Sequence, residues 1–443
     1  MTAEIAIMNK EAIALAADSA VTMGQEGEWE QKVFTSANKL FTLSKYYPVG
    51  IMVYGRASFM GVPWETIIKI YRGNLGKRKV DTLKEYADDF IAFLNNGNPL
   101  FPEEQQKEYL YGNTFSYFAL IIKGEIRKKV QSIIDEEGEI TDTQIKQMTS
   151  GVIKKHYDKW ENAETLPSIP KTHVEDIINK YGDIINKARE EVFEELPISS
   201  VSLTQLRRIA ASLFSKDIFP ANISGVVIAG FGEEETFPSL KSFDIEGIVD
   251  NKLKHKEQYS AGISFKTIAR IIPFAQKEMV HIFMEGVAPG LQNYIEDDLS
   301  KIFEKYPEII VESIEKFDDK EKRALLKKLK QVSNSIFKAY RKRVTSYTKD
   351  NCVDPIMKVV AGLPKDELAM MAETLVNLTS FKRKVALGSE TVAGPVDVAV
   401  ISKGDGFIWI KRKHYFESEL NPQFFAKYYK EEENERKEER SKR

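Results

Sequence analysis

The second residue of the chain is Thr2, and an apolar run begins three positions later, at Ile5. Methionine aminopeptidases remove Met1 when the next side chain is small, as threonine is, so we expect Thr2 to become the first residue. It would then carry a hydroxyl and a free α-amine. An α-amine has a pKa of about 7.7–8.0, so enough of it is neutral at pH 7 to accept the hydroxyl proton. Taken alone, a small residue at position 2 indicates only that Met1 is removed; with suitable neighbours, Thr2 would be a nucleophile that supplies its own base.

Sequence motifs for other common chemistries are absent. The chain has no phosphate-binding G-x-x-x-x-G-K-[ST], no G-x-G-x-x-G after a strand, no G-x-S-x-G and no metal-binding H-E-x-x-H. The five histidines are scattered without metal-ligand spacing, and the single cysteine, Cys352, excludes an internal disulfide. A serine–histidine or cysteine–histidine mechanism therefore has little support, and we expect neither a cofactor nor a metal.

The composition of the 443 residues is typical of a soluble globular protein, and the single cysteine, with the lack of a membrane span or secretory signal, predicts a cytoplasmic one. There are 64 Lys and Arg against 66 Asp and Glu, and the net charge of −2 argues against a nucleic-acid partner. No apolar run approaches the roughly 20 residues that span a bilayer, so no membrane partner is expected. Glu4, Lys10 and Glu11 interrupt the apolar stretch that a secretory signal needs.

Strand-like patterns cluster in three blocks, at residues 2–55, 222–262 and 395–412. The first contains runs such as AIALAAD and VGIMVYG, the second contains two runs, and the third contains two runs around a turn signal at 403–406. A lone hairpin is marginally stable in water, so we expect the three blocks to form one core. Helical tracts flank the blocks, as in PWETIIKIYRGN and in PFAQKEMVHIFMEGV, which starts at Pro273.

The remaining sequence is charged and helix-periodic, and it predicts insertions into that core. The expected parts are core segments at 1–73, 201–287 and 363–415, helical insertions at 74–200 and 288–362, and a charged tail at 416–443. The second insertion contains the basic amphipathic segment 321–343, whose pattern favours a solvated helix face over a binding surface.

The opening TAEIAIMNKEAIALAADSAVT resembles the start of a proteasome β-subunit, in which an N-terminal threonine and a strand lead to a second strand ending in A-A-D-S. Thr2 and Asp18 lie sixteen positions apart, as in that family. ANKLFTL resembles the segment with the family's lysine, here Lys39, and GIMVYGRAS resembles the next strand, which ends at Gly55. GVVIAGFG…FDIEGIV and ETVAGPVDVAVISKGDG resemble the family's central hairpin and last motif. These blocks follow the family's order and cover roughly half of the chain.

The resemblance implies an α+β fold, namely the four-layer αββα sandwich of the N-terminal-nucleophile (Ntn) hydrolases, with two antiparallel sheets and two added helical insertions. It also implies a threonine-type amide hydrolase, with peptides as the favoured substrates. Thr2 would be the nucleophile, and Lys39, paired with Asp18, would lower the cost of forming its alkoxide. The Gly55 N–H would bind the oxyanion, and Glu390 would help to fix the α-amine.

Some positions depart from the family's pattern. Glu390 stands where the family has an aspartate, Ala393 stands where it has a serine, and RIIPFAQ replaces a Gly-Ser-Gly. Lys32 is a competing lysine, although the NKLF context favours Lys39. Ser19, beside Asp18, is expected to have a structural role.

Two functions remain open at this stage. One is a threonine hydrolase related to proteasome, HslV-type and Anbu-type subunits; the other is a catalytically silent Ntn-fold scaffold that binds a partner. Retention of Thr2, Asp18, Lys39 and Gly55 together favours the hydrolase, because a scaffold does not need that set. The implied partners are a peptide or amide substrate, further copies in a homo-oligomer, and an ATPase or another protein.

Overall fold

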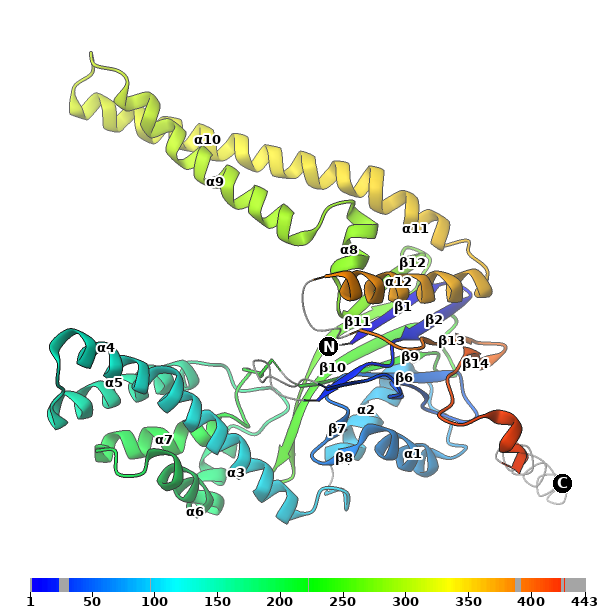
Figure 1. The fold of residues 1–443 in the computed structure, drawn as a ribbon. Coiled ribbons are helices and arrows are strands. Elements are labelled where there is room, and N and C mark those ends of the chain that lie inside the picture. Colours follow the sequence, from blue (N-terminus) through cyan, green and yellow to red (C-terminus); the bar gives the residue numbers. More distant parts are fainter. Residues whose placement is uncertain are drawn as a thin grey trace.

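The computed structural model describes residues 2–23, 32–95, 97–221, 223–386, 392–423 and 426. Within these ranges the chain is an α+β protein built on two five-stranded open antiparallel sheets (Figure 1). The strand order is β12-β1-β2-β13-β14 in the first sheet and β11-β10-β9-β6-β5 in the second. Each sheet therefore combines strands that lie far apart in the sequence.

The strands and helices have the following bounds. The first sheet consists of β12 (Ala269–Ala275), β1 (Ala3–Asn9), β2 (Ala12–Ala17), β13 (Asp397–Ser402) and β14 (Gly406–Lys411). The second consists of β11 (Lys252–Gly262), β10 (Ser239–Val249), β9 (Ser224–Gly230), β6 (Val49–Gly55) and β5 (Leu40–Thr42). Two further antiparallel pairs are β3 (Val21–Met23) with β4 (Lys32–Phe34), and β7 (Ser58–Phe59) with β8 (Val62–Pro63). The helices are α1 (Trp64–Leu75), α2 (Leu83–Asn95), α3 (Glu103–Ala119), η1 (Leu120–Ile126), α4 (Arg127–Glu137), α5 (Asp142–Glu161), α6 (His173–Phe193), α7 (Ser200–Ser212), α8 (Glu278–Glu285), α9 (Pro289–Glu312), α10 (Asp319–Thr348), η2 (Lys349–Val353), α11 (Asp354–Val360), α12 (Lys365–Val385) and η3 (Ser418–Leu420).

The two sheets stack face to face and share an apolar layer. Ala6 and Met8 of β1 and Leu15 of β2 pack there with Met52 of β6 and Val227 of β9, and all five are fully buried. Successive side chains of a strand point to opposite faces, so the odd-numbered residues of β1 lie on the outer face of the first sheet.

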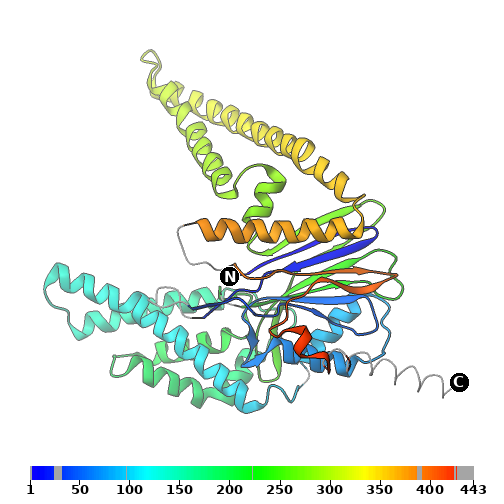
Figure 2. The ribbon, with the colours of Figure 1, turned by 45° about the vertical axis from the view of Figure 1, so that its right-hand side comes forward.

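Helices cover both outer faces of the stacked sheets (Figure 2). On the first sheet, Leu368 and Leu375 of α12 pack against Ile5 and Ile7 of β1. On the second sheet, α1 and α2 form the outer layer. Because β1 and β2 are covered on both sides, their sequences are apolar almost without interruption, unlike strands with one face in water.

The helices α3 to α7 form a lobe with a core of its own, which includes Phe118, Ile153, Ile177 and Ile209. Helix α2 packs with the sheets, and helix α7 packs with the lobe. The lobe therefore begins and ends later in the chain than the insertion that the sequence predicts, at 74–200. A second extension, made of α9 and α10, projects from the body as a hairpin (Figure 1). None of the helices in the described ranges is long and apolar enough to cross a bilayer.

The prediction of one core from three strand blocks is confirmed, because β1, β2 and β13 are neighbours in one sheet and β6 and β9 are neighbours in the other. The turn signal at 403–406 does join β13 to β14. The predicted helix that starts at Pro273 is wrong at its beginning, because Ala269–Ala275 forms strand β12 and pairs with β1. Proline is tolerated there because β12 is an edge strand, and the helix α8 begins only at Glu278.

The intersheet layer can be tested with Leu15→Ala. Leu15 is fully buried, so the substitution should lower the free energy of unfolding by about 2–5 kcal/mol through lost contacts and the cavity left behind. The matched control is Val201→Ala on α7, where the side chain is 65% exposed and the change should stay within about 0.5 kcal/mol. Urea unfolding measures both, and equal effects would contradict the described core.

Candidate active site

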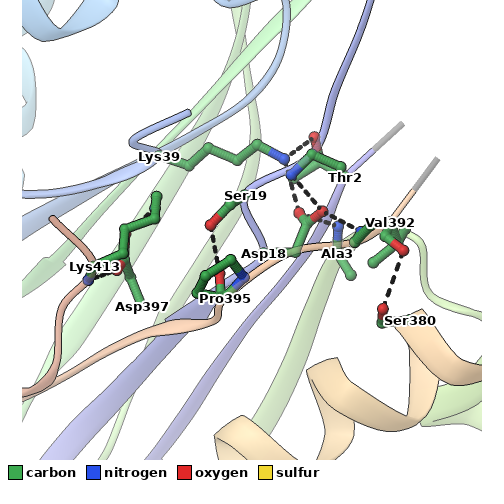
Figure 3. A network of polar contacts seen from close by, with 12 residues as sticks. Thr2, Ala3, Asp18, Ser19, Lys39, Ser380, Val392, Pro395, Asp397 and Lys413 are labelled. Carbon is green, nitrogen blue, oxygen red and sulfur yellow. Dashed lines mark hydrogen bonds and ion pairs between the residues drawn. The ribbon is translucent and has the colours of Figure 1, made fainter. Parts of the chain in front are cut away.

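Thr2, Lys39 and Asp18 converge in one buried cluster (Figure 3). The Lys39 Nζ donates to Thr2 Oγ1 at 3.0 Å and to Asp18 Oδ1 at 2.7 Å. Thr2, Lys39 and Asp18 are 3%, 5% and 0% exposed. The predicted contacts among these three side chains are therefore confirmed, and one ammonium lies against both a hydroxyl and a carboxylate.

Three backbone N–H groups complete the surroundings of the Asp18 carboxylate. Ala3 N donates to Oδ1 at 3.0 Å, while Ala20 N and Ala393 N donate to Oδ2 at 3.1 and 3.3 Å. Together with Lys39, these give Asp18 four donors among the described residues. A buried carboxylate is tolerated when it is paired with a cation and hydrogen-bonded in this way.

The register of the β1–β2 hairpin explains the spacing of sixteen residues between Thr2 and Asp18. Glu4 lies opposite Ala17 in the ladder, and Asp18 N donates to Ala3 O at 3.1 Å. The strands end together, so the residue before β1 and the residue after β2 lie at the same end of the sheet. Thr2 is fixed from the other side as well, because Gln276 N donates to Thr2 O at 3.1 Å.

Lys39 comes from the second sheet. It precedes β5, and its carbonyl accepts a hydrogen bond from Val53 N of β6 at 2.9 Å. Its side chain therefore bridges from the second sheet to the first, and the cluster lies where the two sheets meet at one end. Both the α3–α7 lobe and the hairpin of α9 and α10 extend beyond this end of the sheets, where the chain begins (Figures 1 and 2).

The segment before β13 closes the cluster from a third part of the sequence. Ser19 N donates to Ala393 O at 3.2 Å, and Ser19 Oγ donates to Pro395 O (Figure 3). Ser380 Oγ of α12 donates to Val392 O at 3.0 Å. Ser19 thus has a structural contact, as its position beside Asp18 predicts.

Gly55 ends β6, two residues beyond Val53, which is hydrogen-bonded to Lys39. Its φ of +83° lies in the left-handed region, and a Cβ there would come within 1.9 Å of Ile223 O. A residue with a side chain cannot adopt this geometry without strain. The direction of the Gly55 N–H toward the Thr2 hydroxyl stays a prediction.

Two further predictions concern Glu390 and the competing lysine, Lys32. Glu390 lies outside the described residues. Lys39 is the lysine beside the Thr2 hydroxyl, as the NKLF context predicts, while the side chain of the competing Lys32 is not among those described.

Glu4 is a member of this cluster that sequence reasoning missed. It is 2% exposed, and both of its carboxyl oxygens are buried without a hydrogen-bond partner among the described residues. Burial raises the pKa of Glu4 well above its ordinary value, the Lys39 ammonium opposes that rise, and the Asp18 carboxylate adds to it. Two residues apart in an extended chain, Thr2 and Glu4 face the same side, and this period-two spacing is the signal that could have revealed Glu4.

The arrangement suits nucleophilic chemistry by a hydroxyl. An ammonium that touches Thr2 Oγ1 stabilises negative charge on that oxygen, and the fixed backbone around Thr2 holds the oxygen in place. The described residues hold no group of three or more His, Cys, Asp or Glu side chains that could bind a metal ion. No protein-family model matches the chain, and no characterised protein matches it in sequence.

The buried Glu4 predicts a pH-dependent stability difference between the wild type and Glu4→Gln. Below the ordinary glutamate pKa, both folded and unfolded chains keep Glu4 protonated, so the two proteins should be similarly stable. As the pH rises above it, the unfolded chain releases the proton while the raised pKa keeps it on the folded chain, which lowers the free energy of unfolding of the wild type. Urea unfolding from pH 4 to 8 should therefore show Glu4→Gln becoming progressively more stable than the wild type.

The matched control is Glu11→Gln at an exposed position next to the same β1–β2 hairpin. Its stability relative to the wild type should not change across this pH range. A flat difference for Glu4→Gln would contradict the burial of an un-ionised carboxyl at Glu4.

Proposed function

We propose that the chain is a threonine-type amide hydrolase, a proteasome-like peptidase that uses Thr2 as its N-terminal nucleophile. One observation carries the proposal: the Lys39 Nζ lies 3.0 Å from Thr2 Oγ1 and 2.7 Å from Asp18 Oδ1 in a buried cluster. Burying a lysine ammonium costs free energy. Activation of the threonine hydroxyl explains why the chain buries Lys39 between that hydroxyl and a carboxylate.

The first step is attack by Thr2 Oγ on the carbonyl carbon of an amide. The free α-amine of Thr2 takes the hydroxyl proton, and the Lys39 ammonium stabilises the charge that develops on Oγ. The carbonyl π electrons move to oxygen, and the Gly55 N–H binds that oxyanion in the proposed site.

The tetrahedral intermediate then collapses to an ester. The C–N bond breaks, and the leaving amine takes the proton from the Thr2 α-ammonium. Water next attacks the ester carbonyl while the α-amine accepts a proton from it, and Thr2 Oγ leaves with that proton as the acid product forms. Glu390 is proposed to help fix the α-amine through both stages.

The arrangement of the sheets supports the family proposal. Two stacked antiparallel sheets with helices on both outer faces are what an αββα Ntn hydrolase has, and the proposed nucleophile lies at one end of the stack. In this view the α3–α7 lobe and the α9–α10 arm are additions to the sandwich.

Kinetics of variants test the proposal. With fluorogenic peptide amides, Thr2→Ala should abolish hydrolysis, because the nucleophilic hydroxyl is lost. Thr2→Ser should retain measurable activity because it keeps a hydroxyl and an α-amine. Lys39→Met should lower kcat/KM by at least about 100-fold, the order found when a group that stabilises charge in the transition state is removed.

Lys10→Met provides the matched control, since Lys10 is exposed beside the β1–β2 turn, and its activity should equal that of the wild type. Circular dichroism checks that each variant is folded. Full activity in Thr2→Ala would eliminate the mechanism. A folded wild type with a free Thr2 amine that hydrolyses none of the peptide amides would favour the scaffold instead.

A further inference from the structure

The hairpin of α9 and α10, residues 289–348, is called the arm. Its helices contact each other through an aromatic pair, a hydrogen bond and ion pairs. The centroids of the Phe303 and Phe337 rings lie 5.5 Å apart, and Ser333 Oγ donates a hydrogen bond to Phe303 O. Glu308 pairs with Lys330 at 2.6 Å. The two helices therefore contact each other along one line of side chains, which we call the seam. A two-helix hairpin can bury little more than the side chains along its seam.

The arm exposes many large apolar side chains beyond the seam. On α9 the exposed ones are Leu291, Tyr294, Ile295, Ile302, Tyr306 and Ile309, and on α10 they are Val332, Ile336, Val344 and Tyr347. Ile302, Tyr306 and Ile309 are 51%, 59% and 60% exposed. Single exposed apolar residues are normal on a protein surface, but a cluster of this kind marks an interaction site.

Helical periodicity places most of these side chains on one face of the arm. Ile302 directly precedes Phe303, and Val332 directly precedes Ser333, the two residues in contact across the seam. Since the helices run antiparallel, the residue before each contact residue lies on the same side of the hairpin. Residues three, four and seven positions away continue each stripe, as Tyr306 does on α9 and Ile336 does on α10.

The two helices carry opposite charge. Helix α9 has six acidic and two basic residues, a net charge of −4, while α10 has two acidic and ten basic residues, a net charge of +8. The apolar face has an acidic helix on one side and a basic helix on the other. Such a face is complementary to itself after a two-fold rotation about an axis parallel to the helices.

We propose that the arm is a dimerisation element whose apolar face packs on the same face of a second copy of this chain. In the pair, α9 of each copy lies against α10 of the other, and the four helices form a bundle. This arrangement buries both apolar stripes and places each acidic helix against a basic one, whereas pairing α10 with α10 would bring two strongly positive helices together.

The charges also predict which positions meet. Within the arm, Glu296 pairs with Arg341 and Glu308 pairs with Lys330, which fixes the levels of the two antiparallel helices. After the two-fold rotation, a position on α9 meets the same level of the partner's α10. Asp298 of one copy then lies within about one helical turn of Arg343 of the other copy. Glu312 lies equally close to Lys328 of the other copy.

Sedimentation of the full-length protein tests the apolar face. The wild type should sediment at twice its chain mass of 50.5 kDa, and the double variant Ile302→Glu/Ile336→Glu should sediment as a monomer with unchanged helix content. The matched control is Val201→Glu, which places the same charge on an exposed apolar position of α7 and should leave the dimer intact.

A charge swap tests which helices meet. One chain carries Asp298→Lys and Glu312→Lys, and a second carries Lys328→Glu and Arg343→Glu, so that the ion pairs within each arm are left in place. Each variant alone should be shifted toward monomer because its own contacts are repulsive. An equimolar mixture should restore dimers, all of them mixed.

Several results would overturn the proposal. A monomeric wild type would do so, including one that binds anionic lipid vesicles or double-stranded RNA through α10. A dimer that survives Ile302→Glu/Ile336→Glu would place the interface elsewhere. Failure of the mixed charge variants to form dimers would refute the pairing of α9 with α10.

Discussion

The buried carboxylate of Asp18 is the constraint on which the rest of the site depends. A carboxylate without partners in a protein interior costs several kcal/mol, so its ionised form needs donors from every side. The chain supplies them from three distant segments: Ala3 and Ala20 flank the first hairpin, Lys39 enters from the second sheet, and Ala393 precedes β13. The hydrogen bonds to the Asp18 carboxylate therefore join these parts of the sandwich at one end of the sheets.

This constraint also positions the chemistry. The Lys39 ammonium that is paired with Asp18 also donates to Thr2 Oγ1, and the backbone around Thr2 is fixed by hydrogen bonds to Asp18 and Gln276. Glu4 lies on the same face, and its raised pKa favours a neutral carboxyl. A neutral neighbour leaves Asp18 as the carboxylate that is hydrogen-bonded to Lys39, so the ammonium stays available to stabilise charge on the threonine oxygen.

Much of this organisation is predictable from the sequence because apolar patterns carry it. The continuous runs of β1 and β2 and the turn before Gly406 have physical reasons that a sequence reveals, whereas the relation between Thr2 and Asp18 is expected from the resemblance of the motifs to a known family. Strand β12 is missed because Pro273 suits a helix start as well as an edge strand. The backbone donors to Asp18 are missed because an N–H belongs to every residue except proline, so its role depends on tertiary position alone.

The central claim is that one residue, Thr2, supplies both the nucleophilic hydroxyl and its base. A peptide epoxyketone tests this directly, because its two electrophilic carbons require a hydroxyl and an amine on the same residue. After treatment of the full-length protein, peptide mapping by mass spectrometry should find an N-terminal peptide that begins at Thr2 and carries the whole probe. An N-terminal peptide that keeps Met1 and remains unmodified, or an equal adduct on the Thr2→Ala variant, would contradict the account.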